Sequence, residues 1–242
     1  MIIEGKNSVY EALSAGKTFN KLMVAKGLTD EHSNRIISLA REKNVSINFV
    51  DKKVLDRASE TGRHQGFVAE ITDFVYSEIE DIIALAGSRG EQPFVVILDN
   101  IEDPHNLGSI VRVCECAGVH GVVIPKMRAC AVNATVIKTS AGACNHLPIC
   151  RTANINQMIE RLKKEGFWVY GADMEGEYVY KTNLTGPVAI VIGNEGKGIS
   201  RLTGELCDGM IKLPMYGKVN SLNASTATSA IVYEIVRQRN FK

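Results

Sequence analysis

Three short, uninterrupted apolar runs mark the second half of the chain: residues 94–98, 121–124 and 188–192. Runs without polar alternation are typical of strands that are covered on both faces, as in parallel sheets. Between the second and third runs, apolar residues from Ile155 to Leu162 recur at helical spacing, ahead of a strand expected at 167–170. A final helix is expected from about residue 222 to 238. The pattern predicts an α/β fold built on a parallel sheet.

The first 75 residues alternate between helical and strand patterns. A helix expected at 8–15 ends at Gly16, a residue suited to the left-handed conformation that closes many helices. A second helix, capped by Thr29 or Asp30, is expected to run to Lys43. The other expected elements are strands at 21–25, 46–50 and 66–71 and a helix at 51–58. This part of the chain is predicted to form a small α/β sandwich.

Residues 76–92 differ in composition from both neighbouring parts. They begin with an acidic stretch and end in glycines, shortly before Pro93. Such a segment is typical of a short linker helix followed by a loop. We therefore expect a domain at 1–75, a linker at 76–92 and a second domain at 93–242.

Overall composition narrows the class of protein. The 242 residues are 45% hydrophobic and 23% charged, and the formal net charge is +1. These values exclude an acidic disordered chain and a strongly basic one, although a local basic patch remains compatible with them. No apolar run approaches the roughly 20 residues that a membrane-spanning helix needs. The first residues lack the pattern of a signal peptide, so a cytoplasmic location without membrane contact is expected.

The six cysteines all lie in the second half of the chain. No CxxC pair occurs, and the group Cys144, His146 and Cys150 does not have the usual spacing of zinc ligands. We therefore expect no metal site. The cysteines are interpreted as small buried side chains in a reducing compartment.

A polar segment follows the first apolar run and opens a helix. Asp103 is placed to cap the helix, and Pro104 suits its first position. Asn106 and Arg112 then lie on the first two turns, six residues and about 600° apart. A joint role for these two side chains needs a third element. The simpler interpretation is a helix cap and a surface arginine.

A glycine-rich segment follows the third apolar run. Gly193, Gly196 and Gly198 allow the backbone to approach a ligand closely, although a flexible turn explains them equally well. Their spacing matches neither the dinucleotide-binding fingerprint nor the phosphate-binding loop. Glu195 is unusual here, because the carboxyl edge of a parallel sheet is where ligands bind.

The third polar segment precedes the final helix. Ser221 or Asn223 is expected to cap that helix, whose first turns consist of alanine, serine and threonine. Such small residues allow close packing or leave room for a threaded chain.

Taken together, the three segments resemble the SpoU (TrmH-like) class of SPOUT methyltransferases. Asn106 and Arg112 stand at signature positions of motif 1, residues 193–198 resemble motif 2, and residues 214–217 with 221–223 resemble motif 3. After Arg112 the chain has Val and Cys where the family often has Thr and Ala. The resemblance covers residues 93–242.

This resemblance implies that S-adenosylmethionine donates a methyl group to a ribose 2′-hydroxyl in RNA. It also implies a deep trefoil knot and a homodimer whose active site crosses the interface. By overall appearance the chain is most similar to the 23S rRNA guanosine 2′-O-methyltransferases, so 23S rRNA or a ribosome assembly intermediate is the expected partner.

The resemblance also implies roles for individual residues. The expected catalytic residues are Asn106, Arg112, Glu195, Ser221 and Asn223. The expected cofactor-binding residues are Thr139, Gly142, Ile192, Gly193, Asn194, Gly198, Ile211, Leu213, Pro214, Ser221, Leu222 and Ala224. Arg112 is either the base that takes the hydroxyl proton or, as we favour, a charged group that binds phosphate, since a guanidinium is a poor base.

The first 75 residues resemble the ribosomal-protein-like (L30e-like) RNA-binding domain that is fused to some members of the family. The expected RNA-contacting residues are Lys6, Arg57, Arg63, His64 and Arg112. Two alternatives stay open at this point: the same chemistry on tRNA, and a non-catalytic RNA-binding protein that retains the fold. An oxidoreductase that uses a dinucleotide would need the glycine fingerprint that this chain lacks.

Overall fold

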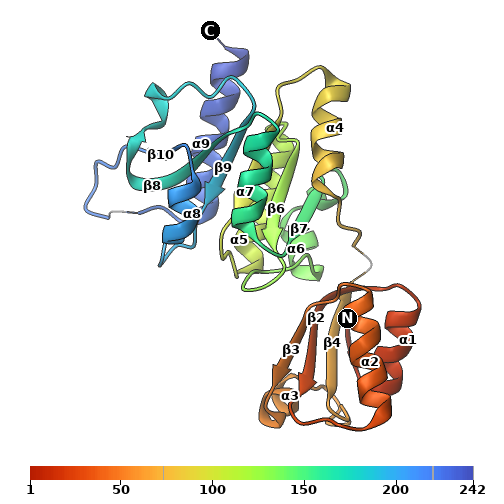
Figure 1. Cartoon of the computed structure of the whole chain (residues 1–242). Helices are drawn as coiled ribbons and strands as arrows, with labels where there is room; N and C mark the ends of the chain where they lie inside the picture. Colours follow the sequence, from red (N-terminus) through yellow and green to blue (C-terminus); the bar gives the residue numbers. More distant parts are fainter. Residues whose placement is uncertain (73, 220, 242) are drawn as a thin grey trace. The chain divides into compact units, whose positions relative to one another are not determined.

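The computed structural model describes residues 1–72, 74–219 and 221–241. The chain divides into two compact units, residues 1–75 and 76–242 (Figure 1). Both units combine helices with a sheet, so the predicted α/β class is confirmed.

The first unit is built on a four-stranded sheet with the order β1-β4-β2-β3. Strand β4 pairs antiparallel with β1 and β2, and β2 pairs parallel with β3. The elements are β1 (Ile2–Glu4), α1 (Lys6–Ser14), β2 (Thr18–Ala25), α2 (Glu31–Glu42), β3 (Ile47–Val50), α3 (Lys52–Ala58) and β4 (Phe67–Thr72). The sequence pattern predicted all of these except β1, which has only three residues.

Helices α1 and α2 cover one face of this sheet. Their buried residues, including Leu13 and Ile36, form one apolar cluster with Leu22 and Phe67 from the strands. A smaller cluster around Leu55 of α3 packs on other strand residues. Because successive strand residues point to opposite faces, the short sheet has an apolar layer on each side.

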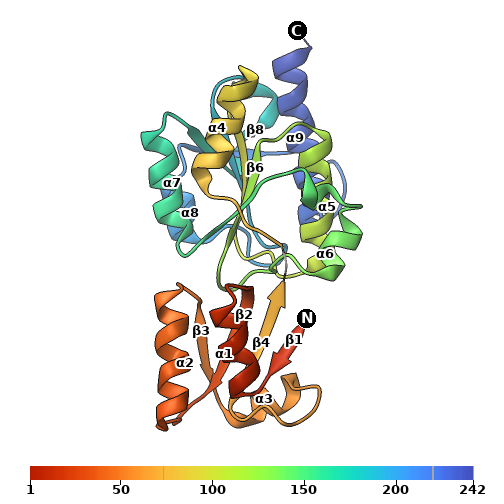
Figure 2. The same ribbon diagram turned by 90° about the vertical axis from the view of Figure 1, so that its right-hand side faces the viewer.

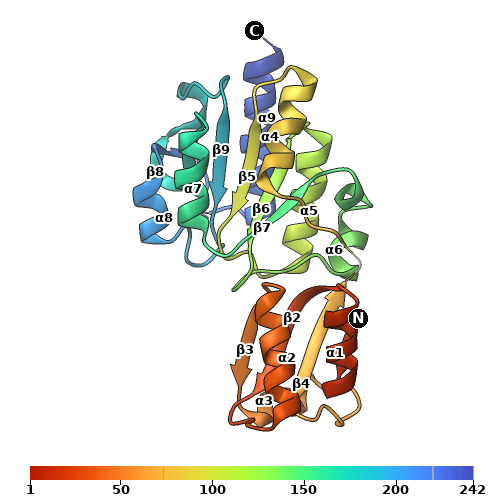
Figure 3. The same cartoon turned by 45° about the vertical axis from the view of Figure 1, so that its right-hand side comes forward.

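The second unit is built on a six-stranded parallel sheet with the order β10-β8-β9-β5-β6-β7 (Figure 3). Its strands are β5 (Phe94–Leu98), β6 (Gly121–Pro125), β7 (Ile149–Thr152), β8 (Trp168–Tyr178), β9 (Val188–Ile192) and β10 (Gly209–Lys212). Its helices are α4 (Ile79–Arg89), α5 (Pro104–Cys116), α6 (Ala134–Thr139), α7 (Ile155–Lys164), α8 (Arg201–Leu206) and α9 (Ala224–Asn240), with short 3₁₀ turns at Ala143–Asn145 and Val179–Lys181.

Helices cover both faces of this sheet. Figure 2 shows α4, α7 and α8 on one side and α5, α6 and α9 on the other. All residues of β5 and β9 are buried, as the uninterrupted apolar runs predict. Among the described residues, no helix combines the length and the apolar character required to cross a membrane.

The segment expected as a linker is different in the structure. Helix α4 packs into the core of the second unit, where Ile79 and Ile82 are 1% and 0% exposed. Gly121 leaves the space for Ile82, since a Cβ at that position would lie 2.4 Å from the Ile82 Cδ1 atom. The acidic start of the segment forms a capping box through Glu78 and Asp81. The segment was interpreted as a linker because its exposed residues include an acidic stretch.

The strand order places β5 and β9 side by side in the middle of the sheet. From β5 the chain proceeds outward through β6 and β7, and then crosses to the other half of the sheet. Ligands of open parallel sheets bind at the carboxyl ends of strands where the order reverses in this way. The segments after β5 and β9 therefore lie at the expected place for a site. The trefoil knot stays a prediction.

Candidate active site

Glu195, in the loop after β9, is the centre of a polar cluster. Its Oε1 atom accepts hydrogen bonds from the Asn106 side-chain amide at 2.9 Å, from the Asn223 side-chain amide and from the Ala224 backbone N–H at 3.3 Å. Asn223 also donates from Nδ2 to Oδ1 of Asn106 at 2.9 Å. Three residues that are far apart in the sequence thus hold one another in fixed orientations.

Two helix N-termini position this cluster. Asp103 caps α5 by accepting from the backbone N–H of His105 at 2.9 Å, and Asn106 follows in the first turn. Asn223 is the N-cap of α9, where its Oδ1 accepts from the backbone N–H of Ser225 at 2.9 Å. The positive ends of the two helix dipoles favour the Glu195 carboxylate at this position.

The glycines of the loop serve mainly to close the loop on itself. The backbone N–H of Gly198 donates to the Asn194 carbonyl at 2.7 Å, and the N–H of Asn194 donates to the Gly198 carbonyl at 3.2 Å. A Cβ on Gly193 would lie 2.2 Å from the Gly198 carbonyl carbon. Gly198 has a φ of 65°, in the left-handed region. The sequence indicated that these glycines allow close approach to a ligand. For Gly193, the structure shows a close approach to the backbone of its own loop instead.

Asp99 fastens this loop to the end of β5, and the sequence reasoning did not identify it. The Asp99 side chain is buried, and its Oδ2 accepts from the backbone N–H of Ser200 at 2.9 Å. The Asn194 side chain donates to the Asn100 carbonyl at 3.1 Å. The signal was present, because a carboxylate directly after a buried strand must find donors.

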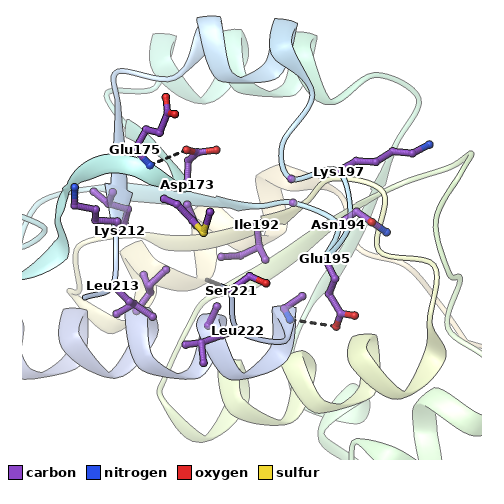
Figure 4. A pocket seen from close by; sticks show the side chains of 18 of the residues that line it. Asp173, Glu175, Ile192, Asn194, Glu195, Lys197, Lys212, Leu213, Ser221 and Leu222 are labelled. Carbon is purple, nitrogen blue, oxygen red and sulfur yellow. Dashed lines mark hydrogen bonds between the residues drawn. The ribbon is translucent and has the colours of Figure 1, made fainter. Parts of the chain in front are cut away.

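Beside the cluster lies a cavity of about 560 Å³ (Figure 4). It is bounded by the ends of β8, β9 and β10, by the loop after β9 and by the start of α9. Nine of the expected cofactor-binding residues line it: Ile192, Gly193, Asn194, Gly198, Ile211, Leu213, Ser221, Leu222 and Ala224. Glu195 lines it as well, and so connects the cavity to the polar cluster.

Three of the expected cofactor-binding residues do not line the cavity: Thr139, Gly142 and Pro214. Thr139 ends α6 and packs against α5, where a Cβ on Gly108 would lie 2.7 Å from the Thr139 Cβ. Gly142 has a φ of 87° and precedes the short turn at Ala143–Asn145. The close approach of Thr139 to Gly108 therefore serves the packing of α6 on α5.

The sequence reasoning missed one wall of the cavity. The strand expected to end at residue 170 continues to Tyr178, and its polar end supplies Asp173 and Glu175. Lys212 comes from the neighbouring strand β10. The remaining residues on the wall that were not expected are Ala172, Met174, Gly196, Lys197, Met215, Ala227 and Ile231.

Comparisons with known proteins identify the family of this chain. Residues 93–233 match the SpoU rRNA Methylase family, and residues 2–77 match the domain described as RNA 2′-O ribose methyltransferase substrate binding. YacO of Bacillus subtilis, which is named for the TrmH family of tRNA/rRNA methyltransferases, is 44% identical over 98% of this chain and 95% of its own. The chain belongs to the SpoU rRNA methylase family.

Solved structures of SpoU proteins share the fold. The SpoU methyltransferase AviRb from Streptomyces viridochromogenes, solved in complex with AdoMet, has a TM-score of 0.63 and 24% identity over 98% of this chain and 90% of its own. The TrmH/SpoU tRNA modifying enzyme of A. aeolicus has a TM-score of 0.56 and 29% identity, over 66% of this chain and 83% of its own. The predicted family is thus confirmed, and the chain is an RNA methyltransferase of the SpoU class.

Arg112, the other signature residue of the first SpoU motif, is not part of the cluster. It lies exposed on α5, and within the described parts of the chain it makes no hydrogen bond or ion pair. Six helical residues after Asn106 correspond to about 240° around the axis beyond one full turn. Asn106 faces Glu195, so Arg112 projects in another direction. Ser221 is exposed and lines the cavity without joining the cluster.

The residues of the SpoU substrate-binding domain that were expected to contact RNA differ in how accessible their side chains are. His64 is 4% exposed, and its ring joins Asp56 at 2.9 Å and accepts from the Gly66 backbone N–H at 2.9 Å. Both ring nitrogens are therefore used inside the domain, which argues against a role for His64 in RNA contact. Lys6 forms an ion pair with Asp30 at 2.8 Å, which leaves its charge partly neutralised.

Arg57 and Arg63 keep the accessibility that an RNA contact requires, since both are exposed. Arg63 follows a loop that Glu4 fixes, because the Glu4 carboxylate accepts from the backbone N–H of Thr61 at 2.9 Å and from that of Glu60 at 3.2 Å. The Ser59 hydroxyl donates to the same carboxylate. These bonds hold the pKa of Glu4 below its ordinary value, with the Ser59 hydroxyl as the largest cause.

The cysteines of the SpoU domain are mostly buried thiols. Burial raises the pKa of Cys150 and of Cys207 to about 11, and it raises the pKa of Cys114 and Cys144 as well. Within the described residues, no three His, Cys, Asp or Glu side chains gather in a way that could hold a metal ion.

Proposed function

We propose that this protein transfers a methyl group from S-adenosylmethionine to the 2′-hydroxyl of a ribose in RNA. The observation that supports this most strongly is the convergence of the three sequence motifs. Asn106, Glu195 and Asn223 form one hydrogen-bonded cluster, and Glu195 also lines the cavity. An arrangement of this kind fixes polar groups where a ribose and a bound cofactor meet, and positioning is the main requirement of such a reaction.

The chemistry of the cavity fits S-adenosylmethionine. Its volume of about 560 Å³ lies within the usual range for small-molecule sites. Ile192, Ile211, Leu213 and Leu222 provide an apolar surface on which a purine ring packs. Asp173 and Lys212 provide charged groups for the polar parts of a nucleoside joined to an amino acid.

When bound, S-adenosylmethionine supplies an activated methyl group on a sulfonium, so the protein need not generate a leaving group. The ribose 2′-oxygen forms a bond to the methyl carbon as the carbon–sulfur bond breaks, and S-adenosylhomocysteine and the hydroxyl proton are released. Glu195 orients the amides of Asn106 and Asn223 by hydrogen bonds that exist before the substrate arrives. Groups that are oriented in advance do not need to reorganise during the reaction.

We further propose a homodimer in which Arg112 reaches the RNA bound at the other copy. The support is its exposed position on α5 and its orientation away from Asn106. A guanidinium keeps its charge at all relevant pH values and binds phosphate through two parallel hydrogen bonds. Arg112 is therefore assigned to the phosphate beside the methylated ribose. Light scattering of the purified chain measures the oligomeric state directly.

The proposed substrate is a guanosine in 23S rRNA, within the mature RNA or an assembly intermediate. The support is the separate substrate-binding domain, because a second contact raises the effective concentration of a large RNA at the site. A tRNA substrate is the second candidate, since the family names of the relatives include both RNAs. The intact polar cluster argues against a non-catalytic RNA-binding protein.

The deciding experiment incubates the full chain with S-adenosylmethionine labelled on the methyl group and with separated rRNA and tRNA pools. Nuclease mapping then locates the labelled nucleotide. Label in a 2′-O-methylguanosine of 23S rRNA is the expected result. Label only in tRNA would support the second candidate. Absence of label in both pools, with binding of RNA retained, would contradict the enzymatic proposal.

A further inference from the structure

Two carboxylates lie at the end of the cavity that is remote from the polar cluster. In Figure 4, Asp173, Glu175 and Lys212 lie on the left side of the cavity, and Glu195 lies toward the right. The carboxylates come from the polar end of β8, which none of the three motifs includes. The proposed reacting centre uses neither of them.

Asp173 has one carboxylate oxygen available for a ligand. Its Oδ1 accepts from the backbone N–H of Glu175 at 2.9 Å, which orients the side chain. Its Oδ2 has no hydrogen-bond partner among the described residues, although the side chain is half-buried on the cavity wall. A carboxylate oxygen is a strong acceptor, so a ligand that supplies donors there gains charge-assisted hydrogen bonds.

The position of Asp173 in the sheet indicates which donors it meets. Strand β8 pairs directly with β9, the strand that leads into the glycine-rich loop. In open parallel sheets that bind nucleosides, the glycine-rich turn follows one strand, and an acidic residue near a neighbouring strand end accepts from the ribose hydroxyls. Asp173 lies two residues beyond Gly171, the last β8 residue that pairs with β9, so Asp173 and the loop at residues 193–198 have a comparable relation.

The other charged groups at this end of the cavity are less well placed. Glu175 is exposed, and Figure 4 shows its carboxylate directed away from Asp173. The Lys212 ammonium lies 4.8 Å from the centre of the Tyr178 ring, where it is already stabilised by a cation–π contact. Asp173 is therefore the group at this end with an oriented and unused acceptor.

We propose that the Asp173 carboxylate binds the 2′- and 3′-hydroxyls of the adenosine part of the cofactor. This inference rests on the proposed function, because it assumes that S-adenosylmethionine occupies the cavity. Asp173 would then select a ribonucleoside, while the apolar wall formed by Ile192, Leu213 and Leu222 holds the purine ring.

The variant Asp173→Asn isolates this contact. An asparagine keeps one acceptor oxygen for the Glu175 backbone N–H, so the turn is preserved. It replaces the free oxygen by an amide nitrogen, which donates hydrogen bonds and cannot accept them. The ribose hydroxyls therefore lose the acceptor that the carboxylate provides. Glu175→Gln is the matched control, since it removes the same charge two residues away on the same wall.

Calorimetry of the full chain with three ligands tests the proposal. The ligands are S-adenosylhomocysteine, 5′-methylthioadenosine, which lacks the amino-acid part, and the 2′,3′-dideoxy form of methylthioadenosine. The wild type should bind methylthioadenosine about tenfold or more tightly than its dideoxy form, as expected for a lost charged hydrogen bond. Asp173→Asn should abolish that preference and weaken the first two ligands equally, whereas Glu175→Gln should keep it.

Each other outcome has a defined meaning. A penalty in Asp173→Asn for S-adenosylhomocysteine alone would place Asp173 against the ammonium of the amino-acid part and overturn the proposal. An unchanged preference for the ribose form in Asp173→Asn would overturn it as well. If the wild type binds none of the three ligands, the proposed function itself fails, and this result differs from both of the others.

Discussion

Gly193 offers the sharpest test of how the loop after β9 is built. A Cβ at this position would lie 2.2 Å from the Gly198 carbonyl carbon and 2.3 Å from the Ile199 nitrogen. Both are backbone atoms, so rotation of a side chain cannot relieve the contact. Ordinary contact begins at 3.4 Å, so residues 198 and 199 must move by about 1.2 Å in Gly193→Ala. The φ of Gly193 is not in the left-handed region, so the effect is purely steric.

The displacement reaches the polar cluster through the loop closure. The two hydrogen bonds between Asn194 and Gly198 close the loop that contains Glu195, which therefore moves with the loop. A displacement of about 1 Å at a reacting centre costs on the order of 100-fold in rate. Overpacking costs about 1–3 kcal/mol in the free energy of unfolding. For a chain of this length, that corresponds to roughly 2–4 °C in Tm for each kcal/mol.

Three measurements on Gly193→Ala separate these effects: kcat/KM for RNA methylation, the affinity for S-adenosylhomocysteine and the Tm. All three should fall, the first by about 100-fold. Gly196→Ala is the matched control, because among the described residues its Cβ would meet only the Asn194 Oδ1 atom, at 3.6 Å. That control should bind and melt as the wild type does. If Gly193→Ala behaved like Gly196→Ala, close packing of Gly193 against residues 198 and 199 would not be what holds the loop in place.

Three further perturbations test the other parts of the molecule. Glu195→Gln should lower kcat/KM by roughly 100-fold with little change in Tm, because the exposed carboxylate orients groups at the site and contributes little to stability; single-turnover methylation and melting curves measure both. Arg112→Lys should cost about 2–4 kcal/mol in the transition state without changing cofactor affinity, since lysine lacks the planar guanidinium, and recovery of activity between about pH 7 and 10 would instead identify the side chain as the base. The Lys6 ammonium is the largest cause that holds the pKa of Asp30 well below its ordinary value. That stabilisation is present above about pH 4 and is lost as the pH falls further, so Asp30→Asn should flatten the acid limb of a Tm-against-pH curve for the full chain.

The sheet of the second unit could be predicted well where burial left a simple pattern. The buried runs at 94–98 and 188–192 are strands with those same bounds. Strand β8 was predicted too short, because its last residues are polar and exposed and its pairing with β10 is irregular at Met210 and Ile211. Strand β1 has no fully buried residue and no alternation of buried and exposed positions, so its own sequence does not indicate a strand. Its pairing with β4 defines it.

Only those site residues that belong to the family motifs could be predicted from the sequence. Asn106 and Glu195 are 89 residues apart, and no periodicity brings them together. The resemblance to the SpoU family predicted that these residues act together, since the three motifs belong to one site in that family. Asp99 begins the first segment but was not identified as a site residue, and Asp173 lies outside all three segments. Asp99 directly follows β5, and Asp173 lies two residues beyond the last β8 residue that pairs with β9, so both are at the edge where parallel sheets bind ligands.

Residue type alone does not determine whether a basic side chain is available to bind RNA. Lys6, His64 and Arg63 counted equally as basic candidates, yet one is paired, one is buried and one is exposed. Partners that are remote in the sequence decide among these states, because Asp30 and Asp56 are acids on other elements. A balanced net charge therefore conceals which charges stay accessible: the Arg57 and Arg63 side chains are exposed, whereas the other two candidates are buried or paired.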